Sequence, residues 1–334
     1  MVTRALIVVL LAGCSSEQQV ARQTATDTYE QAPTDQVDIL WVVDDSVSMA
    51  DEQAGIAAGF DAFVETMTTT ELDFRLGVVT TDMVSSDRRG RMIGDPPYLT
   101  ADDANFVADF QSRVQVGTEG SDREAGIDAA YQALTEPLVS GVNGSFLRTG
   151  AVLSVIYVSD ENDCTDRGAL DGFETSSACY DAADLLVPVN KLAAEYEGLK
   201  SQGERILVSA IVGPPIQANC DGAVPGVRYQ AMAAAFGGLD ESICQTDFGD
   251  IMAELGVQAS GILSTFRLNN AAVEDSLEVY VDDVAVPAGE SAGWTYEPTT
   301  WIVELHGDAI PPRGSSIVIN YEIANGGSLP DTGS

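Results

Sequence analysis

Acidic and hydroxyl residues follow the apolar segment Val37–Val43. The run Asp44-Asp45-Ser46-Val47-Ser48 contains the pattern Asp-x-Ser-x-Ser. Residues two apart in an extended chain point to the same side, so Asp44, Ser46 and Ser48 can face one point. Their oxygens are the hard ligands that magnesium prefers, and magnesium keeps waters or an exchangeable ligand beside the protein oxygens. The spacing therefore predicts one part of a divalent-cation site.

A second acidic residue follows another strongly apolar segment. Asp160 comes directly after Ala151–Ser159, whose length and composition are typical of a buried strand. Open α/β sheets bind ligands in the crevice outside the carboxyl ends of their strands. Asp160, like Asp44, therefore follows the end of a predicted strand.

Together with residues 117–126, these segments resemble the metal-ion-dependent adhesion site of von Willebrand factor A domains. The resemblance covers roughly residues 37 to 258. It implies a doubly wound, mostly parallel sheet and a bound Mg²⁺, with Mn²⁺ or Ca²⁺ as alternatives. A carboxylate from a partner would complete the coordination of the ion. The metal ligands implied by the resemblance are Asp44, Ser46, Ser48, Ser121 and Asp160.

Two hydroxyls compete for the middle position of this site. Ser121 stands five residues before Gly126, which is the spacing that the family uses between this hydroxyl and its helix glycine, and Thr118 is the alternative. The chain departs from the family where Glu161, instead of glycine, follows Asp160. Another interpretation is that the Asp and Ser residues of the first segment only cap the following helix. The three segments occur in the family's order, which favours a cation site over simple helix capping.

Apolar strands alternate with amphipathic helices over residues 37–259. The expected elements, in order, are residues 37–43, 49–68, 74–80, 101–114, 123–134, 151–159, 182–200, 205–212, 229–236 and 247–255. The alternation predicts an α/β fold with a doubly wound, mostly parallel sheet covered on both faces. Over residues 260–325, short strands divided by Gly, Pro and Asp turns predict a small β-sandwich-like module.

The start of the chain has the layout of a secretory signal. A basic residue precedes the apolar run at residues 5–11, which is too short to span a bilayer. Leu11-Ala12-Gly13-Cys14 resembles the lipobox of bacterial lipoproteins, which implies cleavage of a signal peptide (residues 1–13) and acylation of Cys14. We therefore expect export and a lipid anchor in the bacterial envelope, at the outer membrane or cell surface. Residues 14–36 are polar and predict a flexible tether, and residues 326–334 a disordered tail.

The remaining four cysteines form an even set, which suits an oxidising compartment. Of three possible connectivities, we favour Cys164 with Cys179 and Cys220 with Cys244, because each pair closes a short loop within one region. Loops of this size stabilise a fold by about 3 kcal/mol each in the chain-entropy model.

Charge and histidine content limit the functions open to the protein. With 52 acidic and 16 basic residues, the formal net charge of −36 opposes binding to nucleic acid. The sequence has one histidine, His306, so no Ser-His-Asp or Cys-His system and no multi-histidine zinc site can be assembled. We expect no enzyme activity but a membrane-anchored surface protein that binds a protein or other acidic-group ligand through its metal. The alternative is a structural envelope component in which metal is absent or only stabilising.

Overall fold

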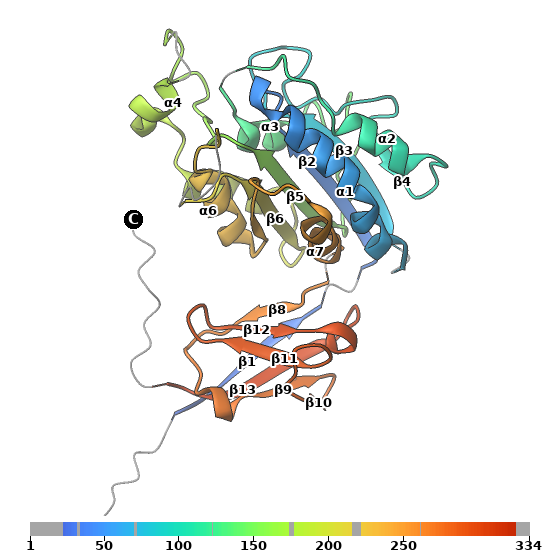
Figure 1. Ribbon diagram of the computed structural model, residues 1–334, viewed down its shortest axis with the longest axis vertical. Coiled ribbons are helices and arrows are strands. Elements are labelled where there is room, and N and C mark those ends of the chain that lie inside the picture. The colour runs from blue at the N-terminus through green and yellow to red at the C-terminus, as the bar shows by residue number, and fades with distance from the viewer. Residues whose placement is uncertain are drawn as a thin grey trace, which may run out of the picture.

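The central sheet of the larger domain consists, within the described residues, of five parallel strands and one antiparallel edge strand (Figure 1). The computed structural model describes residues 23–31, 34–69, 72–121, 123–173, 177–215, 222–260 and 262–324. Across the sheet, the strands are β4 (Tyr98–Thr100), β3 (Asp73–Thr80), β2 (Gln36–Val43), β5 (Val152–Ser159), β6 (Ile206–Val212) and β7 (Asp240–Ser242). The prediction of an α/β fold with a mostly parallel sheet is confirmed.

Helices cover both faces of this sheet. One face carries α1 (Ala50–Thr69), α2 (Phe106–Arg113) and α7 (Gly249–Ala259), and the other carries α3 (Gly126–Ala133), α5 (Val189–Glu197) and α6 (Val227–Phe236). Short helical segments are η1 (Val47–Met49), α4 (Ala178–Asp181) and η2 (Ala183–Leu185). In α1, Ile56, Phe60 and Phe63 recur at helical spacing and are fully buried, with the Phe63 ring 5.5 Å from the Trp41 ring of β2. This apolar stripe fixes α1 against the strand that precedes it.

Some element boundaries differ from those predicted from the sequence. The helix expected over residues 182–200 begins only at Val189. Pro188 disfavours helical backbone in the residue before it, which confines α5 to the residues that follow. Strands β4 and β7 were not predicted, because three residues are too few to show an alternating pattern.

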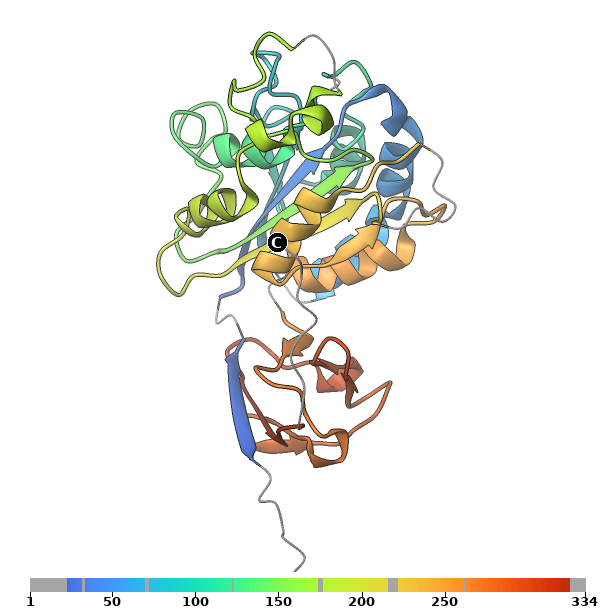
Figure 2. The same ribbon diagram turned by 90° about the vertical axis from the view of Figure 1, so that its left-hand side faces the viewer.

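Two antiparallel sheets form the smaller domain in the described part of the chain (Figure 2). One contains β1 (Thr24–Glu30), β13 (Ser316–Glu322), β9 (Glu278–Val281) and β10 (Val284–Val286), and the other contains β11 (Trp294–Glu297), β12 (Ile302–Leu305) and β8 (Thr265–Arg267). The one-turn segments η3 (Glu274–Ser276) and η4 (Gly307–Ala309) connect these strands. Phe266, Val303 and Ile319 belong to the apolar core that the two sheets share. We call this domain the β module.

The N-terminal strand of the β module corrects the prediction of a tether over residues 14–36. Thr24–Glu30 pairs with β13 along its whole length, in antiparallel register. Sequence periodicity did not reveal this strand because its buried central residue is Asp27. The Asp27 carboxylate accepts hydrogen bonds from the Tyr321 hydroxyl (2.7 Å) and the Asn269 amide side chain (2.6 Å), which satisfy the charge inside the module. Residues 24–30 are therefore a strand of the β module and not part of a tether.

Both chain connections between the domains meet at one buried side chain. The Gln31 amide donates to the carbonyls of Leu263 (2.7 Å) and Pro311 (3.1 Å), and its oxygen accepts from the Leu263 N–H (2.9 Å). The Arg313 guanidinium donates to the carbonyls of Thr34 (2.6 Å) and Ser260 (3.1 Å) on the same two connections. The α/β domain is thus an insertion between β1 and the remainder of the β module.

Several predicted features lie outside the described residues. They are the signal peptide at 1–13, Cys14, Cys220 and the tail at 326–334. Among the described helices, none has both the length and the apolar character needed to cross a membrane.

Candidate metal centre

Asp44 occupies the end of β2 and is fully buried. Its Oδ1 accepts the Ser46 N–H (2.7 Å), and its Oδ2 accepts the hydroxyl of Ser159 (2.6 Å) at the end of β5. The Asp44 N–H donates to the carbonyl of Val158 (2.9 Å), so the ends of the two strands are joined at this point. Burial raises the pKa of Asp44 to about 6, and the nearby charge of Asp160 adds to the shift.

The other predicted ligands of the first and third segments lie beside Asp44. The hydroxyl oxygens of Ser46 and Ser48 are 3.2 Å apart, and the Ser48 hydroxyl is within hydrogen-bonding reach of the Asp160 carboxylate. Asp160 is 5% exposed, and its Oδ1 has no hydrogen-bond partner among the described residues. Burial raises the pKa of Asp160. The structure therefore brings Asp44, Ser46, Ser48 and Asp160 together.

This cluster of oxygens fits a small divalent cation. Two buried carboxylates close enough to repel each other, one of them with an unbonded oxygen, are stabilised by a positive charge between them. Among the described residues, no group of three or more His, Cys, Asp or Glu side chains converges in a way that could hold a metal. A cation at this position would therefore depend on the hydroxyls of Ser46 and Ser48 as well as on the carboxylates.

The second segment is held next to the cluster by a side chain of α1. The Gln53 amide of α1 donates to the carbonyls of Asp44 (2.9 Å) and Gly117 (2.8 Å), and thereby holds the two segments together. The Ser121 hydroxyl accepts the Arg123 N–H (3.0 Å). Within the described residues, no hydrogen bond joins Ser121 or Thr118 to Asp44, Ser46, Ser48 or Asp160. The choice between these two hydroxyls stays a prediction.

Glu124 is a buried acid at this site that sequence reasoning did not identify. Its Oε2 accepts a hydrogen bond from the Thr81 hydroxyl, and its Oε1 has no partner in the described part of the structure. Burial raises the pKa of Glu124 to about 10, and the neighbouring Asp44 charge contributes to the shift. The available signal was an acidic residue between Ser121 and Gly126, but sequence alone does not show which way its side chain points.

Asp45 faces away from the cluster and forms an ion pair. Its carboxylate is fully buried and accepts a hydrogen bond from the Arg88 guanidinium, in the loop that follows β3. Its carbonyl accepts the Gly120 N–H (2.8 Å). A Cβ atom on Gly120 would overlap the Asp45 carboxyl, so only glycine fits this close approach. Asp45 therefore connects three segments around the site.

A disulfide braces the loop that follows Asp160. Cys164 is bonded to Cys179, with 5.3 Å between their Cα atoms, which confirms the predicted pair. The Cys164 N–H donates to the carbonyl of Glu124, so the disulfide loop is tied to the second segment. Cys244 is also disulfide-bonded, and Cys220, its expected partner, lies outside the described residues.

His306 lies in the β module, away from this cluster. It follows β12, and its Nε2 is 2.7 Å from the Thr295 hydroxyl. Its Nδ1 is 3.8 Å from the Glu304 carboxylate. These neighbours place the imidazole on a strand surface.

Comparison with solved structures finds distant likenesses. The pilus adhesin SpaC from Lactobacillus rhamnosus GG is 14% identical with a TM-score of 0.44, and the match covers 92% of this chain and 42% of that one. Proximal thread matrix protein 1 from the mussel byssus is 14% identical with a TM-score of 0.40, covering 73% and 52%. BatB from Bacteroides thetaiotaomicron is 13% identical with a TM-score of 0.35, covering 67% and 96%.

The chain spans less than half of the SpaC structure. No protein-family model and no curated protein matches it. At these identities and TM-scores, the similar structures identify neither a family nor a ligand. The residues of the site itself therefore carry the functional argument.

Proposed function

We propose that the protein is a metal-dependent binding module of the von Willebrand factor A type, with a divalent cation held by Asp44, Ser46, Ser48, Ser121 and Asp160. Mg²⁺ is the expected ion, with Mn²⁺ or Ca²⁺ as alternatives. The observation that supports this most directly is the buried, unbonded Oδ1 of Asp160 beside the buried carboxylate of Asp44. A cation supplies the counter-charge that this pair of acids lacks.

The ligand set would leave the ion able to attract a further acidic group. Two carboxylates cancel the two positive charges of the ion, and the neutral hydroxyls add no further negative charge. A magnesium site also keeps exchangeable positions. A carboxylate from a protein or other ligand can take such a position. The surface around the cluster suits a partner, because Val47 is 77% exposed between the two serines and Tyr180 is 44% exposed. Burial, and then the charges of Glu161, Asp160 and Asp44, raise the pKa of Tyr180.

The proposal includes a lipid anchor at Cys14 in the bacterial envelope. The Cys164–Cys179 disulfide supports an oxidising compartment outside the cytosol. β1 enters the β module, and the cluster lies at the carboxyl ends of β2 and β5, at the end of the α/β domain opposite the β module (Figure 1). An anchor before β1 would therefore present the cation site away from the membrane.

Isothermal calorimetry with Mg²⁺, Mn²⁺ and Ca²⁺ tests the site on the full chain carrying Cys14→Ser, so that no acyl group is added. We expect binding to a single site, and its loss in Asp44→Ala, because the carboxylate at the centre of the cluster is removed. Asp61→Ala is the matched control, since Asp61 is an exposed acid on α1. Unchanged affinity in Asp44→Ala would refute the assigned site.

A further inference from the structure

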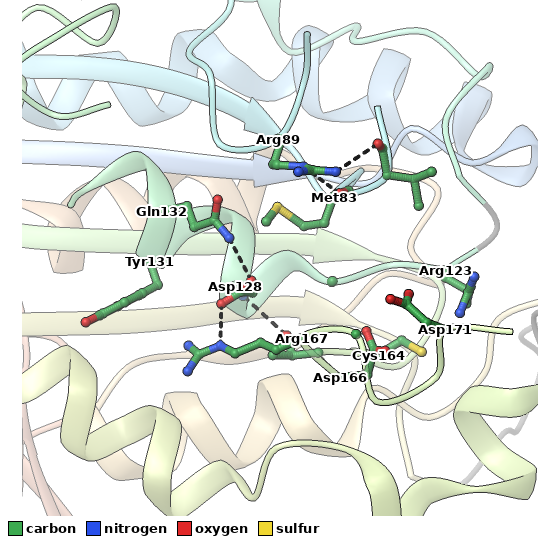
Figure 3. A pocket seen from close by; sticks show the side chains of 14 residues that line it. Met83, Arg89, Arg123, Asp128, Tyr131, Gln132, Cys164, Asp166, Arg167 and Asp171 are labelled. Atoms are coloured by element: carbon green, nitrogen blue, oxygen red, sulfur yellow. Dashed lines mark hydrogen bonds and ion pairs between the residues drawn. The ribbon is translucent and has the colours of Figure 1, made fainter. Parts of the chain in front are cut away.

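A polar cleft lies beside the candidate metal centre. It has a volume of about 610 Å³ and opens between the loop after β3, the exposed face of α3 and the disulfide loop (Figure 3). Met83 and Arg89 come from the first wall, Asp128 and Tyr131 from the second, and Arg167 from the third. The volume is in the range of cavities that bind small ligands or one or two side chains.

Two arginines of this cleft have no acidic partner among the described residues. Arg89 donates to the carbonyls of Met83 (2.9 Å) and Val84 (3.2 Å), and Arg123 donates to the carbonyl of Leu170 (3.2 Å). A guanidinium has five N–H donors, so both side chains keep donors for another group. These free donors lie on the surface of a strongly acidic protein, where a guanidinium can attract an anionic group of a ligand.

The loop that carries Arg89 is held in place by the body of the domain. The Asn143 amide donates to the carbonyl of Gly90 (2.9 Å), and its oxygen accepts the Met92 N–H (3.0 Å). The preceding residue, Arg88, is bound to Asp45 beside the metal centre. Arg89 is thus presented from a fixed loop, which lowers the entropy lost when a ligand binds.

Most of the other charged residues that line the cleft have partners within the chain. Arg167 forms ion pairs with Asp128 (2.9 Å) and Glu195 (2.7 Å), and Asp166 accepts the Leu170 N–H (2.7 Å). Asp171 is the remaining acid in the lining, and it can accept a donor such as a peptide N–H. Arg89 and Arg123 are therefore the groups that can receive an anion.

Short stretches of chain connect the lining of the cleft with the segments of the metal centre. The Arg123 N–H donates to the Ser121 hydroxyl, and Cys164, which lines the cleft, is tied to Glu124. Cys164 is four residues after Asp160, so their Cα atoms are at most about 15 Å apart, a distance that a peptide of about five residues can span. At its rim, Met83 and the 60% exposed Val84 offer apolar contact to a side chain or backbone.

We propose that this cleft binds a second acidic side chain of the partner whose first carboxylate coordinates the metal, so that the partner is an acidic peptide segment. The metal half of this statement rests on the proposed function, whereas the arginine half does not. An acidic peptide carries its carboxylates on separate, flexible side chains. One carboxylate can bind the metal ion while another accepts hydrogen bonds from the arginines. The two arginines also give a strongly acidic protein a local attraction for an acidic partner.

The test uses a dye-labelled hexaglutamate peptide with blocked ends and the full chain carrying Cys14→Ser. Fluorescence anisotropy measures its affinity in Mg²⁺ and, separately, in excess chelator. We expect Arg123→Gln and Arg89→Gln each to weaken binding about tenfold in both solutions, the effect of losing one charge-assisted hydrogen bond. Arg267→Gln, on an exposed strand of the β module, removes the same charge and should change the affinity less than about twofold.

Each half of the proposal fails separately. Equal affinities in Mg²⁺ and chelator would overturn the metal half, while the two arginine variants still report on the cleft. Wild-type affinity in both arginine variants, undetectable binding of the peptide, or an equal loss in Arg267→Gln would overturn the cleft as an acidic subsite. Preference for an oligogalacturonate over the peptide would overturn the assignment to a peptide. Near-wild-type circular dichroism of each variant establishes that the comparison is between folded proteins.

Discussion

Replacement of Asp44 by asparagine, which removes the charge but keeps the shape, tests the electrostatics of the candidate metal centre. Burial raises the pKa of Asp44 from 3.8 to about 6, a difference of about 2 units. At about 1.4 kcal/mol per pKa unit, ionisation of the buried Asp44 lowers the stability of the protein without metal by about 3 kcal/mol. The folded state binds the proton more tightly than the unfolded state, so stability falls as pH rises from about 4 to above 6.

Urea unfolding followed by circular dichroism, at constant ionic strength in excess chelator, measures this contribution. The free energy of unfolding of wild type minus that of Asp44→Asn should fall by about 3 kcal/mol between pH 4 and pH 7. Subtraction cancels the titration of distant acids. Glu124 and Asp160 interact with the Asp44 charge, and both change the difference in the same direction. Asp61→Asn, an exposed control on α1, should give a flat difference.

Saturating Mg²⁺ should raise the stability of wild type relative to Asp44→Asn at pH 7. A cation binds the ionised carboxylate, so it lowers the folded-state pKa of Asp44 and adds binding free energy to wild type alone. Wild type should then be more stable than Asp44→Asn at pH 7. Parallel pH profiles for the two proteins in chelator, together with no effect of Mg²⁺, would refute both the burial argument and the cation site.

Three further perturbations probe the framework of the site. Arg148→Met should lower the free energy of unfolding in urea by about 3 to 5 kcal/mol, because Asp38 is fully buried and its carboxylate is 2.7 Å from Arg148. Adding Asp38→Asn to the same chain should recover part of this loss. Cys164→Ser should lower the unfolding free energy by about 3 kcal/mol, and reduction of the wild type, which also breaks the Cys244 disulfide, should lower it by more. Gly120→Ala should cost about 1 to 3 kcal/mol and weaken Mg²⁺ binding in calorimetry, because its Cβ overlaps a buried carboxyl; wild-type values would contradict the packing described.

The sequence was sufficient to predict the centre of the α/β domain and the residues that meet there. β2 and β5 are buried almost throughout, so their sequences are mostly apolar, with Asp38 and Ser154 as buried exceptions, and the acidic residue after each run follows the end of a strand. Parallel neighbours end at the same edge, which brings Asp44 and Asp160 together without knowledge of any other contact. For buried parallel strands, the apolar composition of a run is enough to indicate where the strand lies in the sequence and where it ends.

Three features were not predictable for specific physical reasons. β1 contains a buried acid where an apolar residue is expected, and the hydrogen bonds that allow it come from Asn269 and Tyr321, more than 200 residues away. Glu124 becomes part of the site only because its side chain turns toward Thr81. The middle hydroxyl lies in a loop positioned by Gln53 of α1, and loop position depends on such distant contacts.

The corrected position of β1 changes how the proposed anchor would present the cation site. Cys14 is ten residues before Thr24, so the remaining tether can span at most about 35 Å. β1 and β2 contain seven and eight residues, which correspond to lengths of about 23 and 26 Å, and both run from the tether end toward the cluster. If Cys14 carries the proposed anchor, the β module would lie between that anchor and the α/β domain.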